Sequence, residues 1–154
     1  EHLASSYAKQ IMNKTCVIYG GTGLTELVSS RWKTQINENS KAKAFIGSMP
    51  EVHHNEILSW QADKDGSMEN FILIFLRSPF EHPQIKKRFE LSEKLLGDKV
   101  QILNISTKES KDELKILMEL VLLGDLTSIH LADNLNMRPE DIDTIEELKK
   151  LLKG

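Results

Sequence analysis

A glutamate and a pair of neighbouring histidines are the residues of this sequence that are best suited to acid–base chemistry. Glu38 lies in the polar stretch "QINENSK", and His53 and His54 follow Pro50 in "MPEVHHNE". Histidine transfers protons near neutral pH, and a positioned carboxylate can act as a general base. From the residues alone, three explanations stay open for this cluster: surface chance, a metal site, or proton transfer.

The metal explanation finds little support in the spacing. His53 and Glu56 are three residues apart and would share one face of a helix. A zinc site needs three or four protein ligands. The other histidines, His2, His82 and His130, stand at no spacing that would complete such a set. The spacing therefore gives the metal explanation weak support, and no motif of this sequence leads us to expect a cofactor.

The glycine-rich turn "YGGTGLTE" at residues 19–26 is a second candidate. Backbone N–H groups at the start of a helix attract anions. A dinucleotide fingerprint starting at Gly21 would need glycine or alanine where Glu26 stands, and a P-loop would need Gly-Lys-Ser/Thr. Both nucleotide interpretations fail. Direct contact with a ligand and a tight turn for close helix packing stay open.

Polar residues also interrupt the apolar stretch "GDLTSIHLADNL" at residues 124–135. Asp125, Thr127 and Ser128 break it, and His130 follows them. A lone histidine in such a helix is more often a core or interface residue than a catalyst.

Apolar patterns predict an alternation of strands and helices. The expected strands are 15–20, 42–47, 71–76 and 100–105, and the expected helices are 3–12, 23–36, 83–96, a long helix from Leu114 onward and a last one through Ile145, Leu148 and Leu152. Three helix starts are also predicted. Pro50 would open a helix toward Trp60, Ser110 with Glu113 would form a capping box, and Pro139 would lie in a first turn.

Strands that alternate with helices pair in parallel through right-handed crossovers. The expected fold class is therefore α/β, a three-layer α/β/α sandwich with a mainly parallel sheet. Ligands of such sheets bind beyond the carboxyl ends of the strands. We expect residues 20–23, 37–41, 47–56 and 77–82 at that rim.

Composition narrows the function classes. The 154 residues are enough for one domain with a core, and the net charge of −3 gives no basic surface for nucleic acid. Apolar runs fall short of the roughly 18 residues of a membrane helix. The single cysteine, Cys16, fits a reducing, cytoplasmic location. Because the chain opens with Glu1 and leads directly into a helical pattern, we expect a fragment of a longer protein.

Three segments resemble one family in order and spacing: "RWKTQINENSK", "PEVHHNE" and "GDLTSIHLA…IEELKKLL". The chain resembles, over nearly its whole length, the C-terminal sugar-isomerase (SIS) domain of the bifunctional phosphoglucose/phosphomannose isomerases. The resemblance implies one SIS domain over residues 1–154, the C-terminal half of a two-domain chain. It implies a metal-free homodimer that interconverts glucose 6-phosphate and mannose 6-phosphate with fructose 6-phosphate. The phosphate-binding loops would belong to the missing N-terminal SIS domain.

The resemblance also assigns roles to residues. It implies that Glu38 is the catalytic base, and that His54 opens the sugar ring and reaches the site from the partner subunit. Near the place of a family lysine in a late helix stands His130, a third catalytic candidate. The candidate substrate-binding residues are Gly21, Thr22 and Arg31.

Two other functions compete with the isomerase. One is an SIS domain that senses a sugar phosphate without catalysis, and proton exchange at C2 of the aldose would separate it from an enzyme. The other is a purely structural dimerisation half. The apolar run at 117–124 fits such an interface and equally fits a core helix.

Overall fold

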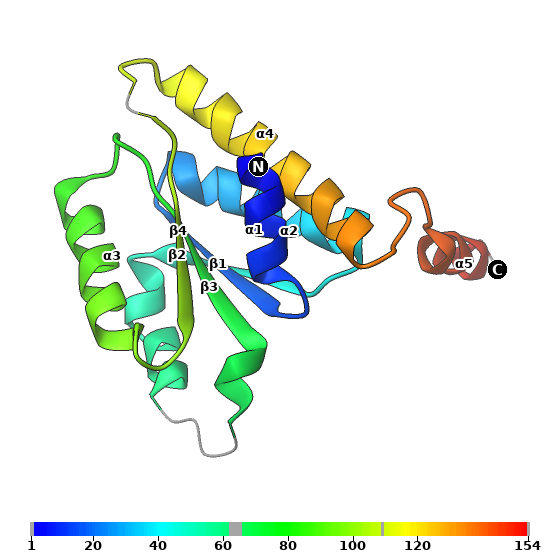
Figure 1. The fold of residues 1–154 in the computed structure, drawn as a ribbon, viewed down its shortest axis with the longest axis horizontal. Helices are drawn as coiled ribbons and strands as arrows, with labels where there is room; N and C mark the ends of the chain where they lie inside the picture. The colour runs from blue at the N-terminus through cyan, green and yellow to red at the C-terminus, as the bar shows by residue number, and fades with distance from the viewer. Residues whose placement is uncertain (1, 62–65, 109, 154) are drawn as a thin grey trace.

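Four parallel strands form one sheet in the order β2–β1–β3–β4 (Figure 1). The computed structural model describes residues 2–61, 66–108 and 110–153. The strands are β1 (Thr15–Gly21), β2 (Ala44–Met49), β3 (Phe71–Leu76) and β4 (Gln101–Ile105). In the register of the sheet, Ile18 pairs with Ile46 on one side and with Ile74 on the other. The predicted parallel sheet is confirmed.

Helices cover both faces of this sheet. One face carries α1 (Leu3–Ile11), α2 (Leu24–Ser40) and α4 (Glu113–Asn134). The other face carries α3 (Pro83–Leu96) and three short 3₁₀ turns, η1 (Glu51–His53), η2 (Glu56–Trp60) and η3 (Ser67–Asn70). The three-layer sandwich is therefore confirmed.

The central strand β3 shows why the sequence folds this way. Its side chains point alternately to the two faces. Ile72 and Ile74 enter the core under α2 and α4, whereas Leu73 and Phe75 enter the core under α3. Because both faces are covered, every position from Ile72 on is buried, which explains the unbroken apolar run "FILIFL".

Helix α2 is fixed against α4 by Trp32. The Trp32 side chain is fully buried, and its Nε1–H donates a hydrogen bond of 2.9 Å to the carbonyl of Leu120. Gly124 lies directly under the indole ring, where a Cβ atom would collide with it. This close approach determines where the whole of α2, including Glu38, sits.

Helix α2 runs antiparallel to the strands, and its length corrects one prediction. It begins after the carboxyl end of β1 and continues to Ser40, beyond the predicted end at residue 36, just before the chain enters β2. Residues 37–41 therefore lie at the amino edge of the sheet, and their expected place at the carboxyl rim was wrong. At that rim, the Thr22 N–H donates to the Met49 carbonyl at 3.0 Å, as expected for residues 20–23.

Three predicted helix starts also differ from the structure. No continuous helix follows Pro50, because the chain there forms η1 and η2 instead. Helix α4 is capped by Asp112, whose carboxylate accepts from Lys115 N–H, and Ser110 only accepts from the N–H of Asp112. The last helix, α5 (Asp143–Leu152), begins after Pro139 and does not include it.

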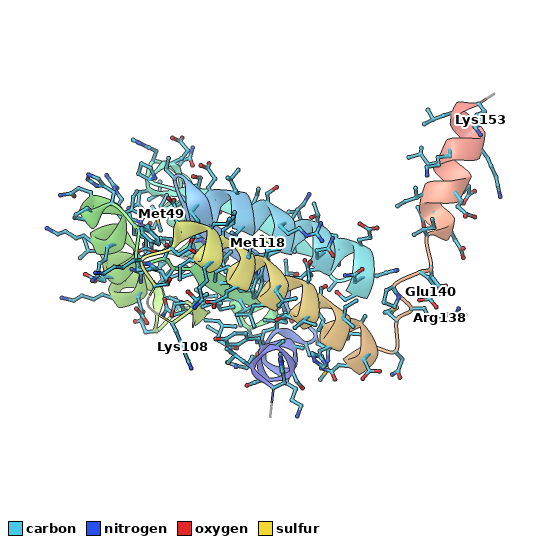
Figure 2. The ribbon with its side chains drawn as sticks, turned by 90° about the horizontal axis from the view of Figure 1, so that it is seen from above. Met49, Lys108, Met118, Arg138, Glu140 and Lys153 are labelled. Carbon is cyan, nitrogen blue, oxygen red and sulfur yellow. The ribbon has the colours of Figure 1, made fainter. Side chains whose placement is uncertain are left out.

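Helix α5 extends away from the sandwich (Figure 2). None of its residues is buried, and its apolar residues Ile145, Leu148, Leu151 and Leu152 are all exposed. No helix in the described ranges has the length and apolarity needed to cross a membrane.

The Trp32–Gly124 contact gives a stability prediction. Gly124→Ala should lower the free energy of unfolding by about 1–3 kcal/mol, because the added methyl group overpacks the α2–α4 contact. Urea unfolding of the purified chain measures this change. Glu119→Ala is the control on the same helix: the side chain is only partly covered, and its ion pair with Lys115 is open to solvent, so the change should stay within about 0.5 kcal/mol. A Gly124→Ala chain more stable than the unmodified protein would contradict the account of α2 packing.

Candidate functional site

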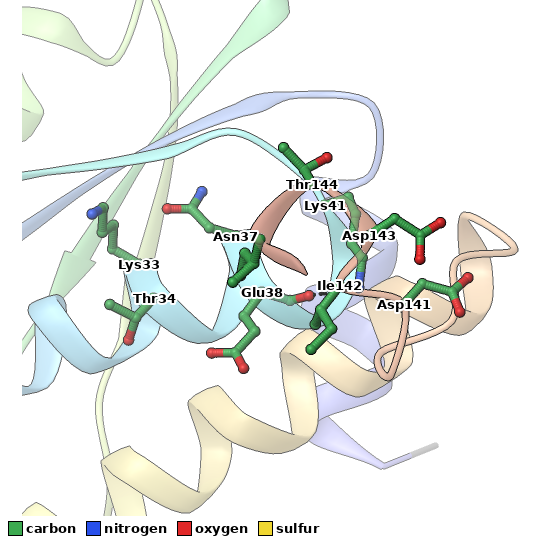
Figure 3. A pocket seen from close by; sticks show the side chains of 10 residues that line it. Lys33, Thr34, Asn37, Glu38, Lys41, Asp141, Ile142, Asp143 and Thr144 are labelled. Carbon is green, nitrogen blue, oxygen red and sulfur yellow. Dashed lines mark hydrogen bonds between the residues drawn. The ribbon is translucent and has the colours of Figure 1, made fainter. Parts of the chain in front are cut away.

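Glu38 is exposed on the last turn of α2 and lines a hollow of about 460 Å³. Lys33 and Asn37 of α2 line the same hollow, and residues 141–145 at the start of α5 close its other side. Figure 3 shows the Glu38 carboxylate between Thr34 and Ile142. The hollow is open, so the carboxylate is accessible to a ligand or to a second protein chain.

The side chain of Lys41 connects the two segments that line this hollow. Its Nζ donates to the carbonyl of Glu38 at 2.8 Å and to the carbonyls of Arg138 and Pro139 at 2.8 and 3.1 Å. These bonds tie the end of α2 to the segment that leads to α5. Sequence reasoning missed Lys33 and Lys41, although the second lies in the same "NENSK" element as Glu38.

The polar residues of α4 pair with α2. Arg31 forms a two-pronged ion pair with Asp125, with Nε–Oδ1 at 3.0 Å and Nη2–Oδ2 at 2.9 Å. Asn39 Nδ2 donates to Ser128 Oγ at 2.8 Å. The carboxylate of Asp125 raises the pKa of Arg31. Arg31 and Glu38 are about two helical turns apart on α2 and therefore lie on one side of the helix.

His130 points elsewhere. Its ring lies 6.1 Å from the ring of His2, which caps the start of α1. Ser128 faces α2, and on a helix a residue two positions further on points to a different side. The structure therefore does not bring His130 next to Glu38.

His54 lies in the segment that follows β2, and its side chain is exposed. The residues on either side of it are tethered. His53 contacts Ser92 Oγ through Nε2 at 2.7 Å and Arg88 Nη1 through Nδ1 at 3.0 Å. Glu56 Oε1 accepts from the Tyr19 hydroxyl at 2.7 Å.

The environments of these tethered groups shift their pKa values. Burial lowers the pKa of His53 most, and the charges of Arg88 and His54 lower it further. Burial also raises the pKa of the Tyr19 hydroxyl, and its hydrogen bond to Glu56 adds to this rise. Tyr19 therefore stays protonated. Its hydroxyl donates a hydrogen bond to Glu56 and accepts one of 2.9 Å from Trp60 Nε1.

A single copy of the chain does not bring Glu38 and His54 together. Glu38 lies about 20 Å along α2 from the helix start at the carboxyl edge. The segment of His54 begins at that carboxyl edge, and its buried residues Val52 and Trp60 belong to the core on the other face of the sheet. The two groups thus lie near different ends and on different faces of the sheet.

Gly21 and Thr22 of the glycine turn form hydrogen bonds within the chain. Gly21 N–H donates to Thr25 Oγ1 at 2.8 Å, and Thr22 Oγ1 donates to the Met49 carbonyl at 2.7 Å. The small hollow of about 120 Å³ beside the turn is lined by Glu113 and by Glu81, whose carboxylate is paired with Arg77. A Cβ atom at Gly20 would collide with the Thr25 carbonyl, so the turn needs glycine for close packing. These contacts favour the packing explanation over contact with a phosphate.

The described part of the chain contains neither a cluster of metal ligands nor a reactive thiol. Within that part, no three His, Cys, Asp or Glu side chains gather as metal ligands would. Burial raises the pKa of the Cys16 thiol to about 12, so it stays protonated in the core.

Comparison with known proteins identifies the family. Residues 1–152 match the family described as the bacterial phospho-glucose isomerase C-terminal SIS domain. The chain belongs to this family. The resemblance seen in the sequence segments is therefore confirmed.

The relatives and the solved structures agree with this assignment. A bifunctional phosphoglucose/phosphomannose isomerase of Aquifex aeolicus is 33% identical over 95% of this chain and 45% of its own length. One of Caldicellulosiruptor bescii is 30% identical over 99% of this chain and 44% of its own. A glucose-6-phosphate isomerase like protein from Thermus thermophilus has the same fold, with a TM-score of 0.73, 14% identity, and coverage of 94% of this chain and 48% of its own. The chain thus spans a little under half the length of the curated relatives that it matches.

The hydrogen bonds of the Tyr19 hydroxyl with Glu56 and Trp60 give a prediction for the stability of the segment that contains His54. Tyr19→Phe should lower the free energy of unfolding by about 1–3 kcal/mol, because it removes one partner each from Glu56 and the buried Trp60. Chemical denaturation measures the loss. Asn55→Ala, an exposed change in the same segment, is the control. A Tyr19→Phe loss no larger than that of the control would show that these hydrogen bonds do not hold the segment.

Proposed function

We propose that this chain is the C-terminal half of a dimeric two-domain isomerase that interconverts glucose 6-phosphate and mannose 6-phosphate with fructose 6-phosphate. Membership of the family and two relatives named as bifunctional phosphoglucose/phosphomannose isomerases support the proposal. The N-terminal SIS domain, for which the unmatched length of the relatives leaves room, would hold the sugar phosphate through its phosphate-binding loops.

The chemistry needs two groups of the kinds found at positions 38 and 54. The imidazole of His54 passes a proton to and from the ring oxygens, which opens the sugar. The carboxylate of Glu38 then removes the proton from C2 and returns it to C1 through an enediol. Mannose 6-phosphate forms the same enediol, and its C2 receives the proton on the opposite face.

The observation that carries the proposal is the match of residues 1–152 to the phospho-glucose isomerase C-terminal SIS family. Within one copy, Glu38 and His54 are too far apart to form a single site. Both side chains are exposed, yet they lie near different ends and on different faces of the sheet. In a two-fold dimer, each contact that one copy makes with its partner is made in return. Glu38 of one copy beside His54 of the other would thus form two equivalent sites.

The other candidate residues have unequal support. Arg31 lies on the same side of α2 as Glu38 and is accessible, which suits a contact with substrate. Gly21 and Thr22 lie at the carboxyl rim where the segment of His54 begins. His130 has the least support, because its ring faces His2 and not Glu38.

Removal of the base tests the role of Glu38. In the full-length isomerase, Glu38→Gln should lower kcat by about 10²- to 10⁴-fold, because the amide cannot accept the C2 proton. Affinity for fructose 6-phosphate, measured by calorimetry, should stay close to that of the unmodified enzyme. Glu119→Gln on α4 is the matched control. Near-normal turnover of Glu38→Gln would remove Glu38 as the base.

Mixed dimers test whether the site is shared. Glu38→Gln and His54→Gln enzymes, each nearly inactive alone, are unfolded together in equal amounts and refolded. In a mixed dimer one site has both variant residues and the other has both native residues. Random pairing should then restore about one quarter of the unmodified activity. If mixing restores no activity although mixed dimers form, Glu38 and His54 do not come from different copies.

A further inference from the structure

We propose that His53 is a positioning residue for His54, because its neutral imidazole ties the short turn that carries His54 to helix α3. The inference rests on the proposed function for what His54 does. The contacts that carry it are independent of that function.

The hydrogen bonds around His53 fix the position of its proton. Ser92 Oγ donates its only proton to the carbonyl of Arg88 at 2.9 Å. The same oxygen must therefore accept the 2.7 Å hydrogen bond from His53, so Nε2 carries the hydrogen. Nδ1 then has a free lone pair, which accepts from Arg88 Nη1 at 3.0 Å. Both bonds are satisfied together only when His53 is neutral.

A second anchor holds the other side of His54. Glu56 accepts from the hydroxyl of Tyr19, which lies in β1 and is 2% exposed, and Trp60 donates to the same hydroxyl. Between the two anchors, only His54 and Asn55 are exposed. The His54 N–H also donates to the carbonyl of Glu51 at 2.9 Å, so the backbone from which its ring projects is fixed on both sides.

The two histidines differ in whether their ring nitrogens are available to a bound molecule. Both ring nitrogens of His53 are occupied by groups of α3, so His53 has no lone pair to offer a substrate. Among the hydrogen bonds of residues 2–61, 66–108 and 110–153, none engages the ring of His54. His54 is therefore the histidine that can exchange protons with a bound molecule, and His53 sets its place.

The two hydrogen bonds of His53, to Ser92 and from Arg88, form a clamp on helix α3. Protonation of His53 would break this clamp. A second hydrogen on Nδ1 would point at the guanidinium of Arg88, so that two donors of the same charge would face each other. Arg88 from α3 and the neighbouring His54 are the charged or titratable groups that act on His53, and β2 contributes no titratable side chain. Because the pKa of His53 is lowered in the folded state, the clamp is intact at neutral pH.

The sign of the pH effect follows from proton binding. Below the ordinary histidine pKa of about 6.5, the unfolded chain binds a proton at this position before the folded chain does. Folding is therefore less favourable as pH falls through this range. Loss of the clamp in the folded chain follows at the lowered pKa.

Three variants of the full-length isomerase test the inference. His53→Ala removes both bonds. His53→Gln keeps one acceptor and one donor at nearly the spacing of the ring nitrogens but cannot be protonated. Lys87→Gln, an exposed substitution on α3, is the control. The readouts are kcat and KM between pH 5 and 8, the histidine ring signals by ¹⁵N NMR, and amide hydrogen exchange of residues 51–56.

His53→Ala should lower kcat by about 10- to 100-fold with little change in KM, because the ring of His54 is no longer held in place. His53→Gln should recover most of kcat and should lose the part of the acid-side decline that comes from the clamp. NMR should show His53 as the neutral form with its proton on Nε2 at pH 7. Amide exchange of residues 51–56 should speed up in His53→Ala and not in His53→Gln.

The failures of the two proposals are distinguishable. If His54→Gln leaves turnover unchanged, the function of His54 is wrong, and the NMR and exchange results alone decide the positioning inference. If His54→Gln abolishes turnover but His53→Ala changes neither kcat nor the exchange of residues 51–56, the positioning inference is overturned. A doubly protonated His53 ring at pH 7 would overturn it as well.

Discussion

The crossover from β1 through α2 to β2 is the constraint on which the site depends. A right-handed parallel crossover carries the chain from the carboxyl edge of the sheet to the amino edge along one face, and β2 then brings it back. Trp32 fixes this crossover helix on α4 by its bond to Leu120 and its contact with Gly124. As a result, two groups that are close in sequence, Glu38 and His54, lie far apart in one copy.

Short polar contacts hold each group at its place. Lys41 ties the end of α2, next to Glu38, to the carbonyls that precede α5. On the other face, His53 and Glu56 tie the segment of His54 to α3 and β1. Each half of the proposed site is therefore held by its own copy before a partner arrives. Such preorganisation lowers the cost of assembling a catalytic geometry.

The sequence predicts those helices and strands whose pattern of apolar residues continues to both ends of the element. The run "FILIFL" is buried on both faces, and the bounds predicted for β3 and α3 are those observed. The end of α2 was predicted too early because its apolar period stops at Ile36. The last turn is held by polar bonds, from Ser40 Oγ to the Ile36 carbonyl and from Asn37 to the Ala42 carbonyl, which leave no trace in that period. This error also misplaced residues 37–41 in the sheet.

The candidate site was predictable in its residue types and not in its geometry. Family motifs pointed to Glu38 and His54, but no local pattern shows that His53 contacts Ser92, which lies on a distant helix.

The central claim is that Glu38 of one copy and His54 of another act on one sugar. A crystal structure of the full-length dimer with fructose 6-phosphate bound tests it most directly. The account predicts both side chains within hydrogen-bond reach, about 2.6–3.2 Å, of the same sugar, each from a different copy. A bound sugar that contacts only one of them, with the other facing bulk solvent, would contradict it.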